Sequence, residues 1–127
     1  MDLYSEIILD HYKNPHNKGH IDSPTCKADE ENPQCGDTLS IELKIENSVV
    51  TEVAFNGAGC AISQAATSML TDYLKGKSIE EINKLKPDDI YKMLGIDISP
   101  GRIKCALLGL STTQQAIKNH NNASKKD

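Results

Sequence analysis

The sequence of 127 residues contains no tryptophan and a single phenylalanine, so aliphatic side chains must build most of the core. Acidic residues outnumber basic ones, so the formal net charge is −4. This charge argues against electrostatic binding of nucleic acid. No apolar run approaches the roughly 20 residues of a membrane span, and the first residues lack the pattern of a signal peptide. We therefore expect a cytoplasmic protein with no nucleic-acid and no membrane partner.

The sequence does contain four cysteines, in a chain whose length fits one domain. Cysteines in a reducing cytoplasm are seldom paired as disulfides, so metal binding or thiol chemistry is the better expectation. We expect the folded domain to span residues 1–118 and the polar residues 119–127 to form a disordered tail.

The hydrophobic pattern predicts strands first and helices later. Residues 38–46 alternate between apolar and polar side chains, and residues 49–55 resume a strand after a turn. A lone hairpin is marginal, so residues 25–31 are the nearest candidate for a third strand. Helices are predicted at residues 3–13, from about 60 to 76, 79–85, from 87 to about 94, and after 99. This order predicts an α+β fold, with a small three-stranded antiparallel sheet and about five helices packed on one of its faces.

Three cysteines lie at boundaries between these predicted elements. Cys35 is in a turn before a strand, with Asp37 two residues further on. Cys60 precedes a helix, whose N-terminus favours the thiolate form. Cys105 falls in the early turns of the last helix beside the cation of Lys104, which also favours thiolate.

Three thiolates and one carboxylate would complete a tetrahedral zinc site, and the same four ligands could bind the two irons of a [2Fe–2S] cluster. A hard carboxylate holds soft metal–sulfur units less firmly than a fourth thiolate, which suits a site that gives its cargo away. The spacing alone leaves a metal site and buried structural cysteines at roughly even odds, since there is no Cys-x-x-Cys pair. A structural zinc module that binds a protein or nucleic acid is a third reading, and the acidic balance disfavours it.

Three ordered motifs and the opening segment resemble the U-type iron–sulfur assembly scaffolds, namely IscU, the N-terminal domain of NifU, and SufU. The segments are Asp10-His11-Tyr12-Lys13-Asn14-Pro15, Asn32-Pro33-Gln34-Cys35-Gly36-Asp37, Gly57-Ala58-Gly59-Cys60-Ala61-Ile62-Ser63 and Arg102-Ile103-Lys104-Cys105-Ala106. The resemblance implies that Cys35, Asp37, Cys60 and Cys105 hold a labile [2Fe–2S] cluster, or Zn²⁺ in its place.

The same resemblance implies that the protein receives sulfur from a cysteine desulfurase, builds the cluster and passes it to recipient apo iron–sulfur proteins. Cys35 and Cys105 are the candidate sulfur acceptors, and the sequence does not choose between them. The chain departs from IscU at Lys104, where IscU proteins carry a histidine. Residues 99–102 also replace the Pro-Pro-Val-Lys segment read by a dedicated Hsp70 chaperone, which argues against recognition by that chaperone.

The surroundings of Cys105 look more like SufU, whose members bind zinc and act as zinc-dependent sulfurtransferases. The 44 residues between Cys60 and Cys105 are nevertheless the compact arrangement of IscU. The alternative function is therefore a SufU-like sulfurtransferase that accepts persulfide sulfur.

The remaining cysteine and the histidines carry weaker expectations. Cys26 matches no ligand motif, and we expect it to have no role in the site. We expect His11 to pack or cap in the first helix, and His16 and His20 to be solvated in a polar loop.

Overall fold

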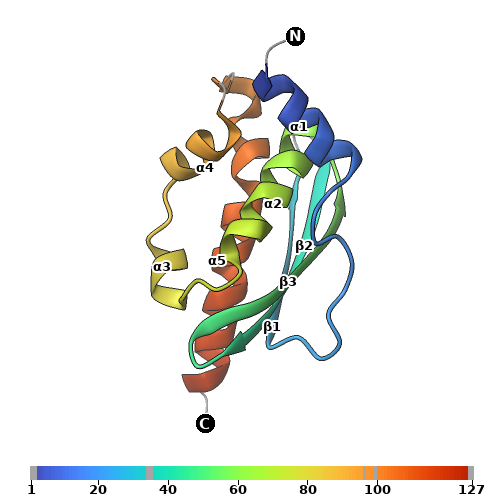
Figure 1. Cartoon of the computed structure of the whole chain (residues 1–127). Coiled ribbons are helices and arrows are strands. Elements are labelled where there is room, and N and C mark those ends of the chain that lie inside the picture. The colour runs from blue at the N-terminus through green and yellow to red at the C-terminus, as the bar shows by residue number, and fades with distance from the viewer. Residues whose placement is uncertain (1–2, 34–35, 96, 99, 126–127) are drawn as a thin grey trace.

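The computed structural model describes residues 3–33, 36–95, 97–98 and 100–125. Its elements are α1 (Leu3–Lys13), β1 (Cys26–Asn32), β2 (Asp37–Glu46), β3 (Val49–Ala58), α2 (Ala61–Leu74), α3 (Ile79–Asn83), α4 (Pro87–Leu94), the 3₁₀ turn η1 (Pro100–Arg102) and α5 (Ile103–Lys125). The strands form one antiparallel sheet in the order β1-β2-β3, with the helices on one of its faces (Figure 1). The predicted fold class is confirmed.

The β2–β3 hairpin follows directly from its sequence. Leu39, Ile41 and Leu43 alternate along β2 and are buried on the helix side of the sheet. Asn47 and Ser48 both have positive φ, at 54° and 63°, which is the backbone of the two-residue turn that matches strand twist. The hairpin is therefore set by local turn chemistry together with one buried face.

The helices form two layers over the sheet. α5 lies against β1 and β2, α2 lies against β3 and α5, and α1 and α4 pack outside α2 (Figure 1). The largest fully buried apolar side chains come from both the sheet and the helices: Phe55, Ile41, Leu43, Leu70, Leu74, Ile82, Ile90, Leu94, Ile117 and Val50. Burying a side chain of this size contributes roughly 1.5–3 kcal/mol, so the core stabilises the sheet and holds both inner helices in place.

Small and polar side chains lie where α2 meets α5. Thr67 is buried, and its hydroxyl donates a hydrogen bond to the carbonyl oxygen of Ser63, at 2.9 Å. A Cβ on Gly109 would lie only 2.8 Å from the Thr67 hydroxyl oxygen, so glycine allows α5 to come this close to α2. This crossing lies one helical turn after Cys105.

The segment between α1 and β1 is fastened to the domain, although its histidines His16 and His20 are exposed, as expected for a polar loop. His16 Nδ1 lies 2.5 Å from an oxygen of Asp72, and His20 Nδ1 lies 2.9 Å from an oxygen of Glu42. The main chain of this segment also pairs with Phe55 on the outer edge of β3. Partners from β2, β3 and α2, which are distant in sequence, thus order a loop that is locally polar.

The last helix continues to Lys125, whereas the sequence predicted a disordered tail from residue 119. The side-chain amide of Asn119 donates to the carbonyl oxygen of Lys27 on β1 (3.3 Å) and so ties this part of α5 to the sheet. The domain boundary at residue 118 stays a prediction. Among the described residues, no helix is both long enough and apolar enough to cross a membrane.

Candidate metal centre

Asp37 is the first residue of β2 and its exposed fraction is 0%. Its Oδ1 accepts a hydrogen bond from the main-chain N–H of Cys60, at 3.0 Å. Its Oδ2 is buried and has no hydrogen-bond partner among the residues that the structure describes. Because leaving a buried acceptor unsatisfied costs about 1–3 kcal/mol, and more for a charged group, this oxygen is suited to a cation.

Cys60 is the N-cap residue of α2. Its Sγ accepts the main-chain N–H of Ser63 at 3.4 Å, in the role that an oxygen of serine or aspartate usually fills. The N-terminus of α2 and this donor both face the sulfur, which ligates metal as a thiolate. The predicted position of Cys60 at a strand-to-helix junction is confirmed.

Cys105 lies in the first turns of α5 and is 1% exposed. The close approach of α5 to α2 at Gly109 brings this early part of α5 toward the N-terminus of α2. Three distant segments therefore meet at one end of the sheet: the start of β2, the cap of α2 and the first turns of α5.

The meeting of these segments produces a compact donor group. One carboxylate oxygen of Asp37 and the sulfurs of Cys60 and Cys105 all lie within 4.8 Å of one another. Donors on a tetrahedral zinc ion are roughly 3.5 Å apart, so the group needs little adjustment to close on a metal. The donor chemistry, two sulfurs and one carboxylate oxygen, fits zinc or an iron–sulfur unit.

Cys35, the fourth predicted ligand, lies outside the described residues. Its neighbour Gly36 has φ of 71°, a left-handed conformation that glycine adopts without strain and that agrees with the predicted tight turn. The turn joins β1 to β2 at the strand ends, where Asn32 is paired with Asp37. Ligation by Cys35 and the complete four-ligand set stay predictions.

Gly57 and Gly59, which precede Cys60, lie close against β2. A Cβ on Gly57 would lie 2.1 Å from the carbonyl oxygen of Thr38, and one on Gly59 would lie 2.4 Å from Oδ1 of Asp37. Both glycines make room for β2 itself, and Gly59 makes room for the ligand carboxylate. This contact joins two segments and has no local sequence signal.

The described histidines all lie outside the donor group. His11 Nδ1 pairs with the hydroxyl of Ser68 on α2, at 2.8 Å, as a packing residue was expected to do. Burial, with the neighbouring charge of His16, holds the pKa of His11 below its usual value. Lys104, which stands before Cys105, is exposed and lines a hollow beside the end of β1.

Cys26 is buried in the core at the start of β1, away from the donor group. Burial raises the pKa of its thiol to about 11. A thiol of this kind is a poor nucleophile and a poor ligand, in keeping with the prediction that Cys26 has no role in the site.

Comparison with known proteins gives consistent matches over nearly the whole chain. The family described as NifU-like N terminal domain matches residues 3–127. The zinc-dependent sulfurtransferase SufU of Bacillus subtilis (strain 168) is 36% identical over 132 residues, covering 91% of this chain and 89% of the relative. The iron–sulfur cluster assembly scaffold protein IscU of Aquifex aeolicus (strain VF5) is 39% identical over 119 residues, covering 92% and 75%.

Solved structures show the same fold. The crystal structure of a nitrogen-fixing NifU-like protein (N-terminal) from Brucella abortus superimposes with a TM-score of 0.78. The match covers 94% of this chain and 95% of the other, at 23% sequence identity. The arrangement of a three-stranded sheet under helices is thus shared beyond close sequence similarity.

Proposed function

The chain belongs to the NifU-like N-terminal domain family of iron–sulfur cluster assembly scaffolds, and we propose that it assembles a labile [2Fe–2S] cluster on Cys35, Asp37, Cys60 and Cys105. We further propose that a cysteine desulfurase supplies the sulfur and that recipient apo iron–sulfur proteins take the finished cluster. The observation that carries this proposal is the buried carboxylate of Asp37, whose Oδ2 has no partner among the described residues and one of whose oxygens lies within 4.8 Å of the sulfurs of Cys60 and Cys105.

The cysteines and Asp37 have different proposed roles, the first in binding the cluster and the second in allowing its release. Cys60 and Cys105 offer soft sulfur ligands, and the Ser63 N–H donates to the sulfur of Cys60. Asp37 offers a hard oxygen that binds iron of a cluster less firmly than a fourth thiolate would. One weak ligand among strong ones makes the cargo removable, which a scaffold requires.

Sulfur acceptance requires an accessible thiolate. The acceptor attacks the outer sulfur of the desulfurase persulfide, so that a new S–S bond forms on the acceptor and the desulfurase cysteine leaves as thiolate. Cys105 is 1% exposed, which disfavours a first attack from that position. We therefore favour Cys35, in the turn between β1 and β2, as the first acceptor, with Cys105 as the competing candidate.

Anaerobic reconstitution tests the scaffold function. Iron(II), cysteine, a cysteine desulfurase and a thiol reductant, which supplies the electrons that turn persulfide sulfur into sulfide, should give the wild-type protein the visible absorption of a [2Fe–2S] centre. The Cys60→Ala variant should give little of it, while Cys26→Ala, which also removes one cysteine, should match the wild type. Equal yield and spectrum from Cys60→Ala would refute the ligand assignment.

A second candidate function is a zinc-dependent sulfurtransferase. The Bacillus subtilis relative carries that name, and Lys104 replaces the histidine of IscU proteins at the corresponding position. On this alternative, zinc-loaded protein should raise desulfurase turnover several-fold and metal-free protein should not. Absence of stimulation by the zinc-loaded protein would remove this candidate and leave the scaffold reading in place.

A further inference from the structure

The outer edge of β1 presents unpaired main-chain groups close to the metal centre. Phe55 on β3 uses its N–H and C=O on residues 17–19, so these groups face away from β2. Ile41 of β2 lies opposite Phe55, so the main-chain groups of Ile41 face β1 and not β3. They therefore bond with those of Ala28, the residue of β1 opposite Ile41. Because this direction alternates from residue to residue, the main-chain groups of Lys27 and Asp29, on either side of Ala28, face the outer edge of the sheet.

The hydrogen bond from the side-chain amide of Asn119 to the carbonyl oxygen of Lys27 agrees with this direction, because Asn119 reaches that oxygen from the outer edge. By the same alternation, the main-chain groups of Asp29 and Glu31 face the edge. Among the described residues, no main-chain partner is found for them there. The edge is thus covered near Lys27 and open where β1 approaches Asn32, the residue opposite Asp37.

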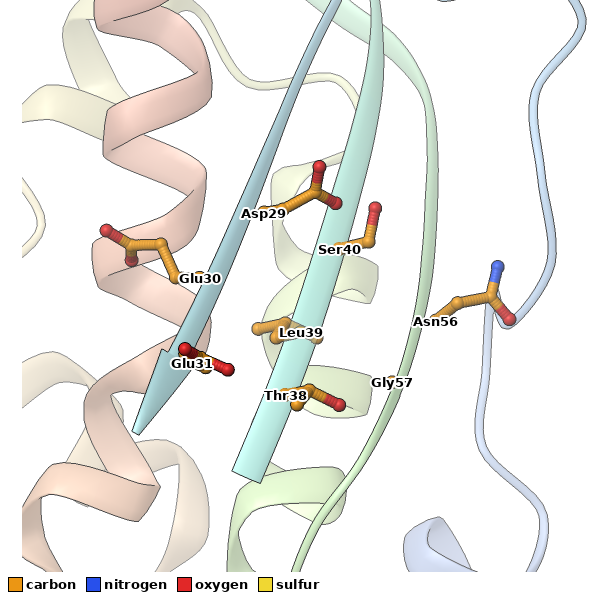
Figure 2. Close-up of a pocket in the computed structure, with 8 residues that line it drawn as sticks. All are labelled: Asp29, Glu30, Glu31, Thr38, Leu39, Ser40, Asn56 and Gly57. Carbon is orange, nitrogen blue, oxygen red and sulfur yellow. The ribbon is translucent and has the colours of Figure 1, made fainter. Parts of the chain in front are cut away.

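Two hollows flank this open part of the edge. The first, of about 470 Å³, lies over the outer face of the sheet, with Asp29, Glu31, Ser40 and Asn56 around it (Figure 2). The second, of about 320 Å³, lies between the end of β1 and α5 and is lined by Pro33, Lys104, Leu107 and Leu108 among others. Glu30 and Glu31 line both hollows, so β1 separates one from the other.

The two hollows share Glu30 and Glu31 and differ in their other lining residues. Asp29 and Glu31 are exposed and form no ion pair with any described residue, whereas Glu30 accepts from the hydroxyls of Ser111 and Thr112. The outer hollow is therefore acidic and unneutralised. The hollow toward α5 adds the partly exposed Leu107, the buried Leu108 and the exposed Lys104.

We propose that the open edge of β1 binds one extended segment of a partner protein as an added strand, with basic side chains over Asp29 and Glu31 and alternate apolar side chains toward Leu107. Side chains of a strand point alternately to the two faces, so one segment fills both hollows while its main chain pairs with the edge. Charged residues on an edge strand discourage indiscriminate pairing, and here they select a basic partner.

The position of this edge suggests which partners use it. A strand added beside Asp29 and Glu31 lies near Asn32, the residue of β1 that pairs with Asp37 at the start of β2. On the proposed function, the partner is a protein that exchanges sulfur or cluster with the centre, whereas the binding of a basic strand does not depend on that function. A second copy of this chain is a poorer occupant, because antiparallel pairing centred on Asp29 places that carboxylate against its own copy.

A peptide titration tests the inference without iron or sulfide, so its failure is separate from failure of the proposed function. The probe is an acetylated and amidated Lys-Val-Lys-Val-Lys-Val peptide, added to the full-length metal-free protein and followed by NMR. We expect hydrogen exchange at the amides of Asp29 and Glu31 to slow at least tenfold at saturation. A peptide with alternate amides N-methylated, and one with glutamate for lysine, should bind at least fivefold more weakly.

Protein variants supply the matched controls. The double change Asp29→Lys with Glu31→Lys should weaken the lysine peptide at least fivefold, while Glu52→Lys on β3 should leave its affinity within twofold. Binding of the methylated peptide as tight as that of the parent, or unchanged exchange at Asp29 and Glu31 with peptide bound, would overturn the proposal. Protection of the same amides in a dimer without peptide would assign the edge to a second copy and also overturn it.

Discussion

Replacing Gly59 with alanine tests how the ligand carboxylate is positioned. The new Cβ would lie 2.4 Å from Oδ1 and 2.9 Å from Cγ of Asp37, closer than real Cβ atoms approach. The backbone of Gly59 is outside the positive-φ region, so alanine itself adds no backbone strain there. The collision must therefore be relieved by moving Asp37, which is fully buried and has little room.

The magnitude follows from the bond that this movement breaks. Oδ1 of Asp37 accepts the N–H of Cys60 at 3.0 Å, and a hydrogen bond to a charged group contributes about 1.5–3 kcal/mol. This bond also fixes the orientation of the carboxylate, one oxygen of which lies within 4.8 Å of the two sulfurs. Loss of such an orienting contact typically lowers metal affinity about 10–100-fold, which corresponds to about 1.4–2.8 kcal/mol. The two estimates agree, so we expect an affinity loss in that range.

Competition with a chromophoric chelator measures the zinc affinity of Gly59→Ala against the wild type. Gly101→Ala is the matched control, because a Cβ on Gly101 meets nothing within 4 Å. Its affinity should equal that of the wild type. Unchanged affinity in Gly59→Ala, with the fold intact by circular dichroism, would refute the role assigned to Gly59 and to the bond between Cys60 and Asp37.

Three further predictions follow from the site and its surroundings. Asp37→Cys should slow transfer of a loaded cluster to an apo-ferredoxin several-fold, because a fourth thiolate binds iron more firmly; transfer as fast as wild type, followed by circular dichroism, would contradict this. Iodoacetamide at pH 8 should modify Cys60 much faster than Cys26, whose thiol has a pKa raised to about 11 by burial; comparable rates by peptide mass spectrometry would count against it. Hydrogen bonds from the Ile21 N–H and then from His20 hold the pKa of Glu42 below its usual value. The ionised carboxylate therefore stabilises the folded state above pH 4.5, and this stabilisation is lost as the pH falls through the lowered pKa of the folded state. Glu42→Gln should therefore cost about 1–2 kcal/mol in urea unfolding at pH 7 and progressively less below pH 4.5, and a constant difference would refute the linkage.

The parts of the structure that local sequence determines were predicted well. The alternation in residues 38–46 and the Asn47–Ser48 turn defined the hairpin, because each depends on neighbours in the chain. The motifs also placed Asp37 and Cys60 at element boundaries, where the structure has them. Local pattern is sufficient in these cases because no distant partner is needed to choose the conformation.

The features that the sequence could not predict depend on distant partners. His16 and His20 are exposed, as their polar loop suggested, but their contacts with Asp72 and Glu42 have no local sequence signal. The end of α5 looked disordered from its polar composition, but its helix reaches Lys125. The fit of Gly59 against the Asp37 carboxylate likewise appears only when β2 and the cap of α2 are brought together.

The most direct test of the central claim is a count of iron and acid-labile sulfide bound per chain after anaerobic loading by a cysteine desulfurase. A [2Fe–2S] scaffold should bind about two of each per occupied site. The count should fall close to zero in Cys60→Ala and stay unchanged in Cys26→Ala. One tightly held zinc that iron does not displace, with no sulfide bound, would contradict the scaffold assignment and favour the zinc-dependent sulfurtransferase.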